Sequence, residues 1–197
     1  MDFWYENEAY SNGFLCVCGI DEAGRGPLAG PVFAAAAVLP RGYEHPVLND
    51  SKKLTEKRRE AVYEDIIKDS IAWAVGISDH KEIDNINILR ASMLAMRRAF
   101  CALAVQPDFA YIDGNCCPGT GVKEQALIKG DALCMSVAAA SVIAKVSRDR
   151  YMLELAKQYP EYMFDKHKGY PTALHYEKLR QYGPSPVHRL TFLKKMH

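Results

Sequence analysis

Paired cysteines, an excess of charge of one sign and a long apolar run are all missing from this sequence. The six cysteines form no C-x-x-C pair and follow no regular spacing. We therefore expect reduced thiols and neither a disulfide framework nor a structural zinc site. The formal net charge is only +1, so any binding to a nucleic acid needs local clusters of lysine and arginine. The longest apolar run, 32–39, is too short to cross a bilayer.

The length of 197 residues is enough for one domain with a proper core and too short for two. We therefore expect a single domain over 1–197. The acidic residues Asp2, Glu6 and Glu8 argue against a transit peptide, and no positive segment followed by an apolar one opens the sequence. These features predict a cytoplasmic protein that does not enter a membrane.

Apolar patterning predicts strands in the segments 14–20, 31–39, 71–77 and 109–112, and a further short strand at 127–129. Thr55 suits the N-cap of a helix that ends near Ile67. Spacings of three and four predict one amphipathic helix over 82–103, and the alanine-rich segment 133–159 predicts a second, buried helix. An opening hairpin followed by alternating strands and helices indicates an α/β fold with a mixed central β-sheet flanked by helices.

The most informative segment is GIDEAGRGPLAGPV, which begins at Gly19. An apolar strand ends in two carboxylates, Asp21 and Glu22, which are natural ligands for hard divalent cations. The glycines in Gly24-Arg25-Gly26 let the backbone approach a ligand closely, while the guanidinium grips an anion. The segment predicts a metal site beside a phosphate or ribose site. Neighbouring residues of a regular strand face opposite ways, so both acids reach one site only if the strand is already ending.

Two further acids, Asp113 and Asp131, also follow short predicted strands. If these strand ends lie side by side, four carboxylates converge, and their mutual repulsion raises their pKa values unless cations neutralise them. Mg²⁺ and Mn²⁺ favour such oxygen ligands, and two ions fit in-line phosphodiester hydrolysis. Taken alone, a turn is the more common role for a residue placed like Asp113, and a helix cap is the more common role for one placed like Asp131.

The candidate phosphate contacts are Lys52 and Lys53 in a polar loop, and Ser141, Lys145 and Arg148 on one helical face. A solvated face with a Lys145–Asp149 ion pair explains the helical group equally well, and 57–59 reads as solvated surface. In the segment 166–172, Tyr170 lies in a rigid loop near basic residues, where it can contact a base or a ribose or simply pack in a turn. The histidines His167, His175 and His188 lack metal-ligand spacing, and we expect them at the surface or in packing.

These motifs resemble the signature of the ribonuclease HII family in its usual order. The resemblance covers about 15–192 and rests on GIDEAGRGP, DSKKL, IDGN, KGDA, ASVIAKVSRD, HKGY and GPS. It implies an RNase H-like fold with a helical C-terminal extension, about 160–197, beside the active site. The implied activity is Mg²⁺- or Mn²⁺-dependent cleavage of the RNA strand of RNA–DNA hybrids, leaving a 5′-phosphate and a 3′-hydroxyl. It includes nicking 5′ of single ribonucleotides in duplex DNA, with roles in primer removal and ribonucleotide excision.

By this resemblance the catalytic metal ligands are Asp21, Glu22, Asp113 and Asp131, with two ions when substrate is bound. The ribose 2′-hydroxyl is read by the backbone of Gly24, Arg25 and Gly26 together with Tyr170. The partners implied are hybrids and ribonucleotide-containing duplex DNA, and we expect a monomer. The first fourteen residues have no counterpart in the family, and no clamp-binding tail is recognisable.

Two other functions are compatible with parts of the pattern. A resolvase- or transposase-like DNA nuclease would share the fold, but the glycine–arginine–glycine element and Tyr170 argue against it. A hybrid-binding module without catalysis would not need all four carboxylates. Cleavage of a duplex with one ribonucleotide, beside an all-DNA control, distinguishes these possibilities.

Overall fold

The structure is a computed structural model of the chain and describes residues 3–48 and 54–194. Its centre is a five-stranded sheet of order β3-β2-β1-β4-β5. The strands are β1 Val17–Ala23, β2 Val32–Val38, β3 Ala72–Ser78, β4 Phe109–Asp113 and β5 Lys123–Leu127. Strand β2 pairs antiparallel with β1 and β3, whereas β4 runs parallel to β1 and β5. The expected hairpin and mixed sheet are confirmed.

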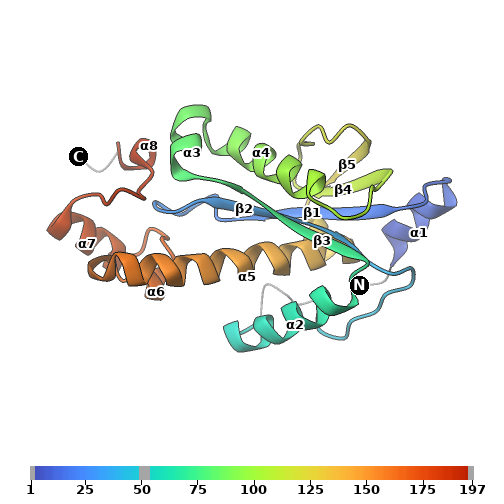
Figure 1. Cartoon of the computed structure of the whole chain (residues 1–197), viewed down its shortest axis with the longest axis horizontal. Helices are drawn as coiled ribbons and strands as arrows, with labels where there is room; N and C mark the ends of the chain where they lie inside the picture. The colour runs from blue at the N-terminus through green and yellow to red at the C-terminus, as the bar shows by residue number, and fades with distance from the viewer. Residues whose placement is uncertain (1–2, 49–53, 195–197) are drawn as a thin grey trace.

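Helices cover both faces of this sheet, with α4 on one side and α5 on the other (Figure 1). The helices are α1 Trp4–Ser11, α2 Glu56–Asp69, α3 His80–Ile86, α4 Ile88–Cys101, α5 Met135–Gln158, α6 Phe164–His167, α7 Ala173–Tyr182 and α8 Leu190–Leu193, with short 3₁₀ turns η2 Gly130–Ala132 and η3 Pro160–Tyr162. Elements α6 to α8 gather at the end of the sheet where β1 ends (Figure 1). Among the described residues no helix has the length and apolarity that a bilayer crossing requires.

Small residues let both helical layers pack closely on the sheet. In β2, Ala35 belongs to the core under α5, and Ala34 belongs to the core under α4, as the two-residue period of a strand requires. On β1, a Cβ at Gly19 would lie 2.1 Å from the backbone carbon of Ser136. The start of α5 is therefore pressed directly onto the strand that carries Asp21.

Several predicted elements shift or divide in the structure. The first strand begins at Val17 and continues through Ala23, so the acids lie inside it. The helix predicted over 82–103 is two helices, because Asn87 adopts a positive φ of 68° and its side chain caps α4. The strand predicted at 127–129 is wrong, since β5 ends at Leu127 and alternates exposed with covered positions, as a polar edge strand does.

Other predictions about the fold are confirmed. The Thr55 hydroxyl accepts a hydrogen bond from the Arg58 amide at the start of α2, and most of the first half of α5 is buried. All six cysteines are free thiols. The helix α1 was not predicted. Its Glu6 is buried and accepts a hydrogen bond of 2.7 Å from the Ser136 amide, so α1 caps the start of α5.

Candidate active site

Asp21 and Glu22 start on opposite faces of β1. Asp21 pairs in register with Ala35 and faces α5, where its carboxylate is hydrogen-bonded to the Ser141 side chain. Glu22 pairs with Ala34 of the opposite core, and its carboxylate lies 3.3 Å from the guanidinium of Arg25. The strand ends one residue later, at Ala23. The two carboxylates therefore flank the terminus of one strand.

Asp113 joins these two acids electrostatically. It is the last residue of β4, and the parallel register that pairs Ile20 with Ile112 places it beside Asp21. Burial raises the pKa of Asp21 well above its usual range, and the charges of Glu22 and Asp113 raise it further. Burial also raises the pKa of Glu22, where Arg25 opposes the shift and Asp113 adds to it. All three carboxylates thus act on one another at this edge of the sheet.

Asp131 lies in the 3₁₀ turn η2 and is buried, with 3% of its surface exposed. It does not cap α5, because the N-cap position of that helix is Cys134. The neighbouring Gly130 amide donates a 2.6 Å hydrogen bond to the carboxylate of Asp113. This contact between distant segments ties the end of β4 to η2, and a local turn does not account for it. A local turn therefore does not fully explain Asp113, and a cap of α5 does not explain Asp131.

The donor set fits a hard divalent cation. The groups are carboxylate oxygens, and the pKa values of Asp21 and Glu22 are raised first by burial and then by neighbouring carboxylates, effects that a bound cation offsets. Within 3–48 and 54–194, no three His, Cys, Asp or Glu side chains form a ready-made cage for an ion. Such a cage is not required, because Mg²⁺ is usually held by one or two carboxylates together with water and substrate phosphates.

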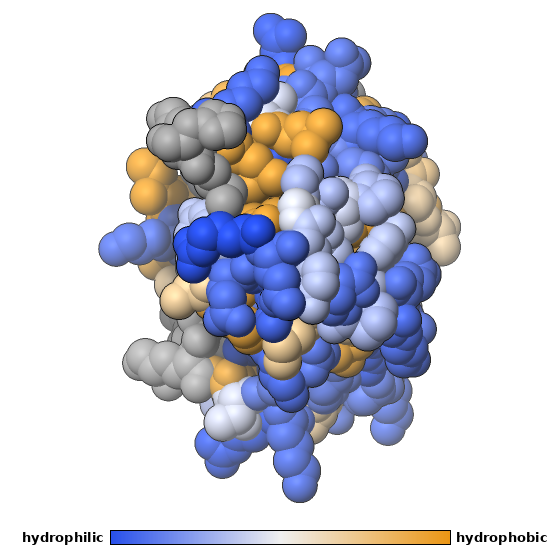
Figure 2. Space-filling view, turned by 90° about the vertical axis from the view of Figure 1, so that its left-hand side faces the viewer, coloured by the Kyte–Doolittle hydropathy of each residue, from blue (hydrophilic) through white to orange (hydrophobic). Residues whose placement is uncertain are grey.

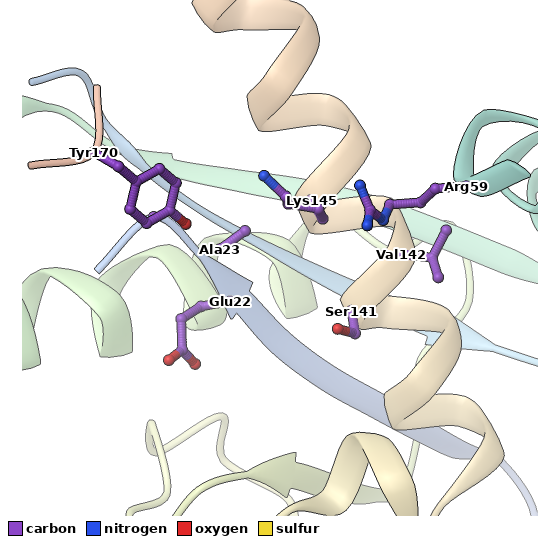
Figure 3. A pocket seen from close by; sticks show the side chains of 8 residues that line it. Glu22, Ala23, Arg59, Ser141, Val142, Lys145 and Tyr170 are labelled. Carbon is purple, nitrogen blue, oxygen red and sulfur yellow. The ribbon is translucent and has the colours of Figure 1, made fainter. Parts of the chain in front are cut away.

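A cavity of about 310 Å³ opens between the end of β1 and α5 (Figure 3). Its lining combines an acid, the glycine turn, basic and hydroxyl side chains and one aromatic ring: Glu22, Ala23, Gly24, Arg59, Ser141, Val142, Lys145 and Tyr170. The end of the molecule where β1 finishes is mostly hydrophilic, with hydrophobic residues in a smaller area (Figure 2). The cavity thus brings together the acidic, glycine-rich and Tyr170 motifs, which are far apart in the sequence.

Two basic residues line the cavity. Lys145 lines the cavity, pairs with Asp149 at 2.7 Å and lies 5.7 Å from the centre of the Tyr170 ring. Arg59, which we interpreted as solvated surface, lines the same cavity from α2 (Figure 3). Lys52 and Lys53 lie outside the described residues.

Arg148 corrects the prediction of a phosphate contact. It is 0% exposed, and its guanidinium donates to the carbonyl oxygens of Ala29, Pro31 and Lys168 at 3.0 to 3.3 Å. The helical face that is open at Ser141 is covered at Arg148, because the chain around Lys168 packs over it. A guanidinium that is buried and bonded to three carbonyls holds backbone in place and is closed to solvent.

Arg189 was missed by the sequence analysis. It is fully buried, and it donates to the carbonyl oxygens of Gly24 at 2.7 Å, Arg25 at 3.0 Å and Gly30 at 2.9 Å. Hydrogen bonds from a buried side chain therefore hold the glycine-rich turn, although that side chain is more than 150 residues away in the sequence. A lone arginine in a proline-containing segment carries no local signal for such a contact.

The histidines are packed in the interior beside Tyr170. Of the two placements that we expected, surface or packing, the second is confirmed. Because the Ser185 amide donates to Nδ1 of His188, that ring carries its proton on Nε2 and donates to Nε2 of His175. His175 then donates from Nδ1 to the carbonyl oxygen of Tyr170 at 3.0 Å. Burial, reinforced by neighbouring histidines, lowers the pKa of both His175 and His188 to about 4. These rings are neutral at pH 7.

The mixed sheet, the helices on both of its faces and the acids at adjacent strand ends define a nuclease of the RNase H-like class. A profile of the family "Ribonuclease HII" matches residues 18–197. Curated ribonuclease HII proteins are similar over most of their length. That of Caldicellulosiruptor bescii is 50% identical over 98% of this chain and 94% of its own. That of Dechloromonas aromatica is 55% identical over 89% of this chain and 90% of its own.

Solved structures agree with this assignment. The ribonuclease H2 of Pyrococcus horikoshii superposes with a TM-score of 0.74 at 30% identity, covering 90% of this chain and 93% of its own. A ribonuclease HIII, Bst-RNase HIII, solved with Mn²⁺, shares the fold with a TM-score of 0.70 at 21% identity over 93% of this chain and 69% of its own. The chain belongs to the ribonuclease HII family. It is an endoribonuclease that acts on RNA–DNA hybrids.

Proposed function

We propose that this enzyme hydrolyses the RNA strand of hybrids and also nicks 5′ of a single ribonucleotide embedded in duplex DNA, leaving a 5′-phosphate and a 3′-hydroxyl. One observation carries the proposal: Asp21, Glu22 and Asp113 act on one another directly beside a cavity that Gly24 and Tyr170 also line. Carboxylates provide the hydrolytic chemistry, and the turn with Tyr170 provides contacts to a ribose. The biological roles that follow are primer removal and ribonucleotide excision.

The residues that would hold Mg²⁺ or Mn²⁺ are Asp21, Glu22, Asp113 and Asp131. Two ions with substrate bound would supply activation of the attacking water and stabilisation of the leaving oxygen. The protein's own contribution is to orient the carboxylates. Ser141 and the Glu22 amide hydrogen-bond to Asp21, and the Gly130 amide hydrogen-bonds to Asp113. At Asp21 these bonds oppose the effect of burial on the pKa and so favour the ionised carboxylate that a cation needs.

Substrate binding is assigned to the cavity wall. Tyr170 is 36% exposed and lines the cavity together with Gly24, so its phenol is accessible to a ribose. We assign the opposite contact to the backbone of Gly24, Arg25 and Gly26. Lys145 and Ser141 face the same space and suit a phosphate of the backbone. The helical segment that begins at residue 160 supplies Tyr170, and we propose that the chain works as one catalytic unit and as a monomer.

The deciding experiment compares three duplexes of one sequence: a uniform RNA–DNA hybrid, a DNA duplex with one ribonucleotide and an all-DNA control. Each is incubated with Mg²⁺ and with Mn²⁺. We expect cleavage of the first two at ribonucleotides only. Equal cutting of the all-DNA control would favour a resolvase-type nuclease, and binding without cleavage would favour a hybrid-binding module.

A further inference from the structure

The geometry of Arg189 bears directly on the turn that lines the cavity. Its Nη2 donates to the carbonyl oxygen of Gly24, and its Nη1 donates to that of Arg25. The chain contains no cis peptide bond in its described part. In a trans peptide the C=O and the following N–H point in opposite directions. Holding the two carbonyls inward therefore turns the amides of Arg25 and Gly26 away from the buried guanidinium.

The backbone of Arg189 is itself held by hydrogen bonds, and these fix the point from which its side chain extends. The Arg189 amide donates to the carbonyl oxygen of Leu28 at 2.8 Å. The next amide, that of Leu190, donates to the carboxylate of Asp84 on α3 at 2.8 Å. The guanidinium has a neighbouring buried cation in Arg148, and burial together with that cation lowers the pKa of Arg189 to about 9. It remains charged at pH 7, which strengthens its hydrogen bonds to the carbonyls.

We propose that Arg189 is a positioning residue that aims the amides of Arg25 and Gly26 at the ribose of the substrate. This inference rests on the proposed reading of a ribonucleotide by the same turn. Arg189 is 0% exposed, so it acts through the backbone and does not touch the substrate. Two donors pointing the same way suit an oxygen acceptor such as a 2′-hydroxyl or an adjacent phosphate oxygen.

The test replaces the planar guanidinium of Arg189 by the single ammonium group of lysine. In Arg189→Lys one ammonium group cannot reproduce donation to three carbonyls on two stretches of chain. We measure kcat/KM on the single-ribonucleotide duplex and on the uniform hybrid, and take the ratio. We expect the ratio to fall about tenfold, because misdirected amides lose their contacts with an isolated ribose. A uniform hybrid is less affected, since it can bind in other positions along its RNA strand.

A matched control separates positioning from loss of stability. Met96→Ala removes a fully buried side chain on the α4 face, away from the turn, and lowers the melting temperature without altering the turn. Its ratio should equal that of the wild type. Arg189→Gln, which keeps two amide donors but no charge, should fall between the wild type and Arg189→Lys.

The possible outcomes are distinguishable. A wild type that does not cut the single-ribonucleotide duplex overturns the proposed function. A wild type that does, with both Arg189 variants folded and their ratios within twofold of it, overturns the positioning role. If neither variant folds, the test is a nuclear magnetic resonance titration of the wild type, followed at its backbone amide resonances. Those of Arg25 and Gly26 should shift on binding the single-ribonucleotide duplex without divalent ions and not on binding all-DNA duplex, and equal shifts would overturn the inference.

Discussion

Replacing Gly24 by alanine tests how tightly the glycine turn is packed against α5. Gly24 has a φ of +100°, and a Cβ there would lie 2.1 Å from Nε and 2.4 Å from Cδ of Arg148. A non-glycine residue at such a φ costs about 1–2 kcal/mol. Arg148 cannot move into solvent, because it is buried and donates to three carbonyls, and each carbonyl left without a donor costs about 1–3 kcal/mol.

We therefore expect Gly24→Ala to lower the free energy of unfolding by about 2–5 kcal/mol. For a domain of this size, each kcal/mol lowers the melting temperature by about 2–4 °C. Thermal unfolding followed by circular dichroism measures the loss, and cleavage of the single-ribonucleotide duplex measures the effect on the turn. Activity should fall even at temperatures where the variant is folded, because the displaced guanidinium no longer fixes the loop.

Gly42→Ala is the matched control for this prediction. Gly42 also has a positive φ, +71°, but a Cβ there meets no heavy atom within 4 Å. Its substitution should cost only the backbone term, about 1–2 kcal/mol, and should leave cleavage unchanged. If the two variants lose equal stability, the close packing of Arg148 against Gly24 does not contribute, and the reasoning is refuted.

Three further outcomes are expected. Asp21→Asn or Asp113→Asn should abolish cleavage with Mg²⁺ or Mn²⁺ while the melting temperature is kept, because a repelling charge is removed at nearly constant volume; near-normal turnover would contradict the site. Tyr170→Ala should reduce cleavage of the single-ribonucleotide duplex more than that of a long hybrid, and an equal reduction would argue against ribose reading. The lowered pKa values of His175 and His188 mean that the unfolded chain binds more protons between about pH 6.5 and 4. Their contribution to stability should be complete above pH 6.5 and lost as the pH falls toward 4, and denaturant titrations of the wild type and His188→Asn should differ in slope over that range.

The clustering of the acidic residues was predictable because its signal is local. Asp21, Glu22 and Asp113 each stand at or near the end of an apolar strand, and parallel pairing brings such ends together. The sequence could not show how two successive residues share a site. The structure shows that they flank the end of β1 and that Asp113 acts on both.

The contacts that hold the glycine-rich turn were not predictable in the same way. Arg59 lies in a run of basic residues that is typical of solvated surface, and only the packing of α2 on α5 turns it toward the cavity. Arg148 has the spacing of an exposed face, yet the chain near Lys168 covers it. Arg189 reaches the turn from the far end of the sequence. Such contacts depend on tertiary packing, which neither periodicity nor spacing records.

The continuous helix α5 connects the acidic cluster to the loop that carries Tyr170. Ser141 contacts Asp21, and seven residues later Arg148 contacts the loop that carries Tyr170. Seven residues of α-helix span about 10 Å. The distance between Asp21 and the Tyr170 loop is therefore fixed by one packed helix, and it cannot change unless that helix bends. Under the proposed function, this distance sets where the RNA is cut relative to the recognised ribose, so an insertion within this stretch should move the cut site or abolish cutting.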